Sequence, residues 1–320
     1  MAPIVKSASD SHCDFTMLEQ MVPRDCRTMH LSKPALEHAT LPIDSQWADL
    51  AVSFDLLGLE WLSLFSSDFV DRVRSWIDAG WADRFYFLHK PPGLRIRFRV
   101  RCEQLLPEVE RFLDEKATQN CLEAWHHRFY ETESYRFGGE TGMDIAHEFF
   151  TAESLAVLGY LRICLQGNTR LSRQQFSLRL LLELFERVVE GRWELWDIWC
   201  KMQLVERVAT VSPEVLAAAR LEAERSGSPI ALLLRNRDEL LATASADERE
   251  LLERYRPEAD HIAGRLRWAR EHGKLLYGLR SILPSWVVFH WNRMGFSIAE
   301  QRSMCLIMIH LLGPDELQHP

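Results

Sequence analysis

Arg95, Arg97 and Arg99 alternate with apolar residues in the segment from Leu94 to Val100. A period of two is that of a β-strand, which would place the three guanidinium groups on one face. Guanidinium forks match carboxylates in bidentate geometry, so this face could form the floor of a carboxylate-binding site. The alternative is a solvated strand face, because three like charges on one face of a sheet repel one another and favour either water or an anion.

A second segment with chemical potential runs from Tyr130 to a pair of glycines, Gly138 and Gly139, and carries Glu133 and Arg136 between them. Paired glycines allow the backbone to turn sharply or to approach a ligand closely. The alternative is a turn with a local ion pair.

The third segment places a histidine, an amide and a guanidinium within four positions, as His290, Asn292 and Arg293. A histidine of near-neutral pKa is the usual general acid or base in catalysis. A structural histidine is the alternative, because many single histidines only satisfy hydrogen bonds inside a core.

The elements that must position these residues begin with a hairpin. Residues 84–89 and 94–100 predict two strands, with Pro91-Pro92-Gly93 as the turn between them. Residues 121–130 alternate weakly and predict a third strand. From Trp47 the apolar spacing is that of a helix, through Leu50, Phe54, Leu57 and Trp61.

Further helices are predicted from apolar positions repeated at the helical period. They cover Phe69 to Trp76 and residues 105–116, 143–166, 172–190, 193–207, 213–226, 246–272 and 297–312. This is an α+β pattern, with a small antiparallel sheet early in the chain packed against a mostly helical C-terminal half. Residues 1–45 are polar and irregular and predict an N-terminal arm, followed by one domain over 46–320.

The bulk composition excludes several classes of protein. A net charge of −8 over 320 residues argues against a dominant nucleic-acid-binding surface. No apolar stretch is long enough to span a bilayer, and the seven scattered cysteines indicate reduced thiols of a cytoplasmic protein. Phosphate-binding loops, zinc-ligand spacings and a GxSxG motif are absent from the sequence.

The order of the segments resembles one family, the C-terminal elimination domain of lantibiotic dehydratases, over roughly residues 47 to 312. The motifs are Phe85-Tyr86-Phe87 with Leu94-Arg95-Ile96-Arg97-Phe98, then Tyr130-x-x-Glu133-x-x-Arg136-Phe137-Gly138-Gly139, then His147-Glu148-Phe149-Phe150-x-x-Glu153-Ser154, and His290-x-Asn292-Arg293. Two positions depart from the family pattern. Leu94 stands where that pattern has histidine, and Phe137 stands where it has tyrosine.

In that family, glutamate from glutamyl-tRNA esterifies serine or threonine of a precursor peptide, and the C-terminal domain then expels the glutamate to leave dehydroalanine or dehydrobutyrine. The resemblance implies that this chain is such a carbon–oxygen lyase. It implies His290, Arg97 and Arg136 as catalytic residues, with His290 transferring the proton. The implied substrate-binding residues are Arg95, Glu133, Asn292, Arg293, Gly138 and Gly139.

The large glutamylation domain of full-length relatives does not occur in this sequence, so the resemblance implies a free-standing eliminase. Its partners would be a precursor peptide, with leader and core, and a separate tRNA-dependent glutamyltransferase. We expect no direct nucleic-acid contact, no membrane contact, no metal and no cofactor. The sequence leaves open whether the protein forms a homodimer.

Two other functions are compatible with the same resemblance. Thiopeptide pyridine synthases are similar proteins that join two dehydroalanines in a formal cycloaddition and release the leader peptide, without needing the glutamate-binding arginines. The presence of Arg95, Arg97, Arg136 and His290 together favours elimination. A scaffold that only presents a precursor peptide to other enzymes would need a groove but not His290.

Overall fold

A computed structural model describes residues 47–54, 68–90, 92–202, 213–224, 234 and 241–314. The predicted N-terminal arm, residues 1–45, lies outside the described residues, as do Leu57 and Trp61. No helix in the described ranges is long and apolar enough to cross a membrane.

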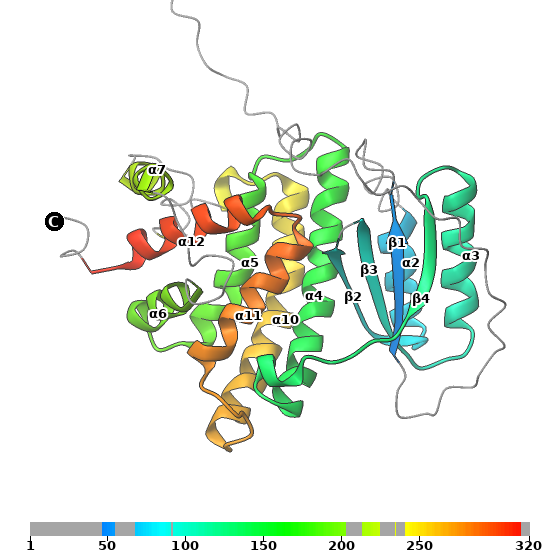
Figure 1. Cartoon of the computed structure of the whole chain (residues 1–320), viewed down its shortest axis with the longest axis horizontal. Coiled ribbons are helices and arrows are strands. Elements are labelled where there is room, and N and C mark those ends of the chain that lie inside the picture. The colour runs from blue at the N-terminus through cyan, green and yellow to red at the C-terminus, as the bar shows by residue number, and fades with distance from the viewer. Residues whose placement is uncertain are drawn as a thin grey trace, which may run out of the picture. The chain divides into compact units, whose positions relative to one another are not determined.

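Four strands form one antiparallel sheet in the order β2-β3-β1-β4, so that the strand that comes first in the chain lies inside the sheet (Figure 1). The strands are β1 (Trp47–Ser53), β2 (Ala82–Lys90), β3 (Gly93–Val100) and β4 (Ala124–Arg128). The predicted hairpin is confirmed, since β2 and β3 pair along their length. The predicted third strand is confirmed as β4, which pairs with β1.

The helical prediction from Trp47 onward is wrong for the residues that the structure describes, because Trp47–Ser53 is the strand β1. Five consecutive residues in the middle of β1 are buried. A strand covered on both faces lacks the alternation of polar and apolar residues, and a short apolar run of this kind cannot be told from a helix by its period.

The predicted alternation in β3 is confirmed. Leu94, Ile96 and Phe98 are buried on one face, and the arginines between them are half-buried on the other. Neighbouring strands in register add their own side chains to the same two faces.

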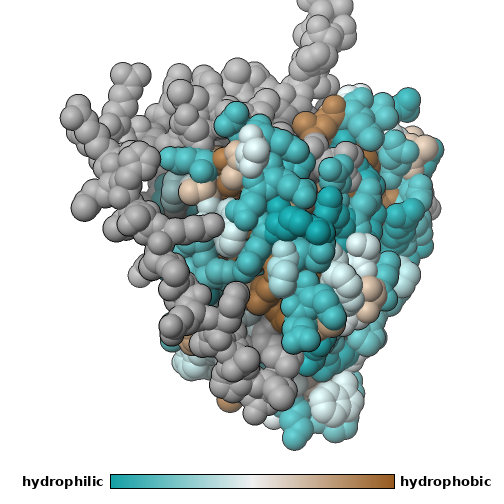
Figure 2. All heavy atoms as spheres, turned by 90° about the vertical axis from the view of Figure 1, so that its right-hand side faces the viewer, coloured by the Kyte–Doolittle hydropathy of each residue, from teal (hydrophilic) through white to brown (hydrophobic). Residues whose placement is uncertain are grey.

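The apolar face of the sheet packs against two helices, α2 (Asp68–Asp78) and α3 (Leu105–Thr118). The Phe69 ring of α2 lies 5.9 Å from Phe85 of β2 and 5.2 Å from Phe112 of α3. The opposite side of α3 carries exposed polar residues, and Figure 2 shows that this side of the molecule is mostly hydrophilic.

Seven further α-helices follow the sheet in the described part of the chain (Figure 1). They are α4 (Glu140–Leu165), α5 (Arg173–Val188), α6 (Arg192–Met202), α7 (Pro213–Glu224), α10 (Ala246–Glu271), α11 (Leu279–Arg293) and α12 (Ile298–Leu312). Six of them coincide with predicted helices, and the predicted sheet-then-helix order is confirmed. α10 packs against α4 and α5, whereas α12 packs against α6 and α7.

Three of these helices begin at a serine that forms a capping box. Ser172, Ser245 and Ser297 each accept a hydrogen bond from the backbone three residues on, and the Gln or Glu at that position bonds back to the serine N–H. The pattern satisfies two otherwise unpaired backbone donors at each helix start.

α11 was not predicted from the sequence, although it carries His290. It contains Pro284 and is apolar nearly all round, since eleven of its fifteen residues are buried. A helix surrounded by other helices shows no polar stripe, so the helical period is hidden.

The helical half meets the sheet along β2. The Phe150 ring of α4 lies 5.1 Å from the Tyr86 ring, and the backbone N–H of Phe85 donates to Oγ1 of Thr151 at 3.1 Å. This contact holds α4 beside the strand face that carries the arginines.

Candidate functional site

A pocket of about 310 Å³ opens over the arginine-bearing face of the sheet. Its walls carry four cationic and three carboxylate side chains, and each of the four strands contributes at least one of them. The lining residues are Asp49, Lys90, Arg95, Arg97, Arg128, Phe129, Glu131, Thr132 and Glu133.

The strand register explains why these residues meet. Asp49 of β1 pairs with Arg97 on one side and with Arg128 on the other, so the three side chains form one row on the same face. Ala51, two residues on, pairs with Arg95 and His126 and forms the next row.

Arg97 is held in place from several sides. Its Nε donates to Oδ2 of Asp49 at 3.0 Å, and its Nη1 donates to the hydroxyl of Tyr86 at 2.8 Å. Its guanidinium also lies 4.6 Å from the centre of the Tyr130 ring and 5.3 Å from that of Tyr86. Charged hydrogen bonds and ring contacts of this kind fix the orientation of a guanidinium before any ligand binds.

The positive charges of Arg95 and Arg128 are less fully compensated than that of Arg97. Neither side chain makes an ion pair with a carboxylate of the described residues. Burial lowers the pKa of Arg95, and the neighbouring charge of Arg128 lowers it further. Two guanidinium groups that repel each other at the floor of a pocket favour an anion between them.

The rim opposite the floor is the segment that follows β4. Glu131, Thr132 and Glu133 line the pocket there, and the next residues form a short 3₁₀ helix, η2 (Ser134–Phe137). Oε2 of Glu133 lies 3.2 Å from Nη1 of Arg136, whose side chain is 61% exposed. The local ion pair proposed for this turn is therefore present.

The two glycines after η2 have the backbone conformations that the sequence suggested. Gly138 has φ of 87° and Gly139 has φ of 91°, values at which residues with a Cβ are strained. They lead directly into α4 and pack against Leu276 and Ile282. Their observed contribution is a tight turn between the pocket rim and α4.

His290 lies in a closed cluster within the helical half. Its Nδ1 faces Oε1 of Glu153, its Nε2 shares a 2.7 Å hydrogen bond with Oγ of Ser177, and Arg293 lies 2.9 Å from Oε2 of the same glutamate. All four side chains are fully buried. The glutamate, histidine and serine have the order of a nucleophile-activating relay, but solvent does not reach the serine.

The charges in this cluster follow from burial. Burial lowers the pKa of His290 well below its usual range, and Arg293 lowers it further. Burial also lowers the pKa of Arg293 to about 9. At neutral pH the ion pair is that of Glu153 with Arg293, and the histidine is a neutral hydrogen-bonding bridge.

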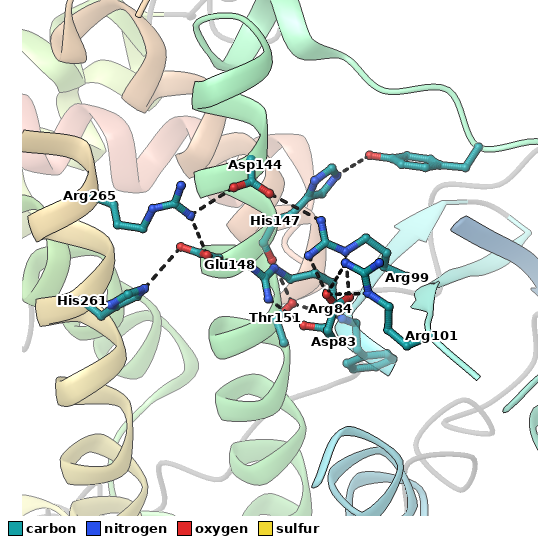
Figure 3. Close-up of polar contacts among 12 residues, drawn as sticks. Asp83, Arg84, Arg99, Arg101, Asp144, His147, Glu148, Thr151, His261 and Arg265 are labelled. Atoms are coloured by element: carbon teal, nitrogen blue, oxygen red, sulfur yellow. Dashed lines mark hydrogen bonds and ion pairs between the residues drawn. The ribbon is translucent and has the colours of Figure 1, made fainter. Parts of the chain in front are cut away.

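An ion-pair network links the sheet to the helices beside the pocket (Figure 3). Arg99 donates two hydrogen bonds of 2.7 Å to Asp83 and reaches Asp144 of α4 at 3.5 Å. Arg265 of α10 donates to Asp144 at 3.1 Å and to Glu148 at 2.6 Å. Arg99 therefore joins the sheet to α4.

A hydrogen bond beside this network holds Tyr130, whose ring contacts Arg97. The hydroxyl of Tyr130 lies 2.7 Å from Nε2 of His147 on α4, and the His147 ring packs 4.3 Å from that of Trp47. Burial lowers the pKa of His147 to about 3, with a smaller contribution from Arg99. The ring that contacts Arg97 is thus anchored to α4 through a neutral histidine.

The structure brings together three of the predicted site residues, Arg95, Arg97 and Glu133, in one pocket. Arg136 does not line that pocket and is joined to it only through Glu133. The roles of these residues in catalysis or binding stay predictions.

The predicted residues on α11 are not brought to the pocket. His290 and Arg293 belong to the buried cluster, and Oδ1 of Asn292 accepts a hydrogen bond of 3.3 Å from Gln301. Their proposed roles are untested by this geometry and stay predictions.

Sequence reasoning missed four charged residues that line the pocket. The sequence does not point to Asp49, because the apolar spacing from Trp47 predicts a helix there, nor to Arg128, because residues 121–130 alternate too weakly. Lys90 ends β2 and Glu131 follows β4, and their distance in the sequence hides that they face the same space. In the described ranges, no group of three or more His, Cys, Asp or Glu side chains is placed to hold a metal ion.

The fold of this chain is similar to that of two solved structures. The tRNA-dependent lantibiotic dehydratase MibB from Microbispora sp. 107891 has a TM-score of 0.60 and 20% identity, and the match covers 87% of this chain and 29% of that chain. TsrL has a TM-score of 0.56 and 16% identity, with 83% of this chain and 93% of that chain covered. At 20% and 16% sequence identity, these comparisons show that the folds are similar and nothing more.

No curated protein matches the sequence. The family "lantibiotic biosynthesis dehydratase C-term" matches residues 63–312. That match spans most of the chain and includes the hairpin, the pocket rim and the buried cluster. The protein therefore belongs to the lantibiotic dehydratase C-terminal family.

Proposed function

We propose that this protein removes glutamate from glutamylated serine and threonine residues of a ribosomally made precursor peptide, giving dehydroalanine and dehydrobutyrine. The observation that carries the proposal is the pocket floored by Arg95, Arg97 and Arg128 in a chain of a dehydratase family. Such a floor suits a ligand that carries a carboxylate.

The proposed elimination breaks the Cα–H and Cβ–O bonds of the esterified residue. A base takes the Cα proton, the released electron pair forms the Cα–Cβ double bond, and glutamate leaves with its α-carboxylate. Negative charge develops on the adjacent peptide carbonyl and on the leaving carboxylate, where fixed donors are most effective. Arg97 suits this task because Asp49 and Tyr86 hold it in place beforehand.

The proton acceptor is assigned to one of two neutral histidines. His290 is the residue predicted from the sequence, and its use requires water or substrate to reach the buried cluster. His126 is exposed and lies in the same row of the sheet as Arg95. Burial lowers the pKa of His126, as do Arg95 and Arg128, so it is also neutral at physiological pH.

The proposed partners follow from this chemistry. A precursor peptide supplies the ester, and a separate tRNA-dependent glutamyltransferase forms it, both in the cytoplasm. The net charge of −8 supports a chain that does not bind tRNA by itself. MibB is described as tRNA-dependent, and the match to this chain covers 29% of MibB.

The test is to incubate the purified protein with a precursor peptide that has been glutamylated beforehand. Mass spectrometry should show loss of the glutamyl group and appearance of the dehydrated residue. Arg95→Gln should slow this reaction by roughly 10- to 100-fold, as expected for loss of a charged hydrogen bond. Arg111→Gln, on the exposed side of α3, is the matched control and should react as the unmodified protein does.

A glutamylated peptide that stays intact would contradict the proposal. Conversion of a peptide with two dehydroalanines into a pyridine macrocycle would instead identify a pyridine synthase. Binding of the peptide without any reaction would identify a scaffold.

A further inference from the structure

The pocket contains charges of both signs that have no ion-pair partner among the described residues. Arg97 is compensated by Asp49, and Glu133 is compensated by Arg136. On the floor, Arg95 and Arg128 make no ion pair with a carboxylate of the described residues, and on the rim Glu131 makes none with a described cation. The cations and the carboxylate stand on different elements that face one space.

This arrangement differs from a simple anion site. A ligand with only a carboxylate gains from the two arginines but is repelled by Glu131 at the rim. A ligand that also carries an ammonium group converts that repulsion into attraction. An exposed Glu131 that has no cationic partner in the described part of the chain therefore favours a ligand of mixed charge.

We propose that the pocket binds a zwitterionic aminoacyl group, with its carboxylate between Arg95 and Arg128 and its ammonium group at Glu131. The inference rests on the proposed function and specifies the substrate. In a glutamyl ester the α-carboxyl group is esterified, so the side-chain carboxylate and the α-ammonium group are the two charges that remain. Arg128 and Glu131 then determine which acyl group is accepted.

The test uses two small probes that differ only in the ammonium group. Glutamic acid α-amide carries both charges, and glutaramate has the same amide and carboxylate without the amine. Binding of each to the full protein is measured by calorimetry or by NMR titration. We expect the α-amide to bind roughly tenfold more tightly, the effect of one partly exposed charged contact.

Two variants test the ammonium contact and the carboxylate contact of the ligand separately. Glu131→Gln should abolish the preference between the probes, because only the ammonium contact is lost. Arg128→Gln should weaken both probes by the same factor and leave the preference unchanged. Glu123→Gln, an exposed residue near β4 that does not line the pocket, should change neither.

Equal binding of the two probes, failure of both to bind, or a preference that survives in Glu131→Gln would overturn the inference. Elimination is measured separately on glutamylated and glutarylated peptides. If the glutamylated peptide is processed while the probes bind equally, the ammonium site is wrong and the proposed function stands. If the preference holds and no ester is processed, the proposed function is wrong and the binding site stands.

Discussion

Nδ1 of His290 on α11 faces Oε1 of Glu153 on α4, and neither side chain is exposed to solvent. Arg293 pairs with the other oxygen of the same carboxylate, and Ser177 of α5 bonds the far side of the imidazole ring. The Glu153 carboxylate thus joins α4 to α11, and the imidazole ring that it faces joins α11 to α5.

Replacing Glu153 by glutamine should strongly destabilise the protein. The change leaves Arg293 as an uncompensated buried cation, which typically lowers the free energy of unfolding by about 3–5 kcal/mol. Urea denaturation measures the difference. Glu115→Gln, at an exposed position of α3, is the control and should change the free energy by about 0.5 kcal/mol or less. Equal effects of the two variants would mean that the cluster contributes little.

His290→Asn should leave peptide affinity close to that of the unmodified protein and lower the rate of glutamate release by about 10²–10⁴-fold, the usual effect of losing a positioned acid or base. The assay follows release from glutamylated peptide at a temperature where the variant is folded. His126→Asn is measured beside it. If His290→Asn reacts at the normal rate and His126→Asn does not, the base is His126 and His290 is structural.

Tyr86→Phe should slow glutamate release by roughly tenfold, because it removes the hydroxyl that holds Arg97 and keeps the ring. Tyr255→Phe is the matched control, since its buried hydroxyl has no hydrogen-bond partner in the described part of the chain. A similar rate for both variants would show that Tyr86 does not need to orient the arginine.

Acidification should destabilise the fold through His147. Burial lowers its folded pKa to about 3 from an ordinary value of 6.5, so between these values the unfolded chain holds the additional proton. This contribution is fully present above about pH 6.5 and decreases on acidification, by up to about 1.4 kcal/mol per pH unit. Urea denaturation between about pH 7 and pH 5 measures the slope.

His147→Gln should reduce that slope, because glutamine cannot take up the proton. His272→Gln, at an exposed position, should leave the slope unchanged. An unchanged slope in His147→Gln would assign the acid sensitivity to other groups.

The arginine strand was predictable because one face of β3 is buried and the other is not, so the period of two is visible in the sequence. The central strand β1 could not be predicted, because burial on both faces removes the alternation of polar and apolar residues. The partners of His290 also leave no local pattern, because Ser177 lies 113 residues away in the chain. Positions on a predicted face could be found, but side chains brought together by distant elements could not.

The inner position of β1 has a consequence for how the chain becomes functional during synthesis. β1 emerges first, yet its two hydrogen-bonding edges are taken by β3 and β4, which follow about 40 and 70 residues later. The floor of the pocket is therefore complete only after Arg128 has left the ribosome, and the rim at Glu131 follows at once. A nascent chain that is shorter than this presents an open strand edge, which other strands can pair with, and no binding site.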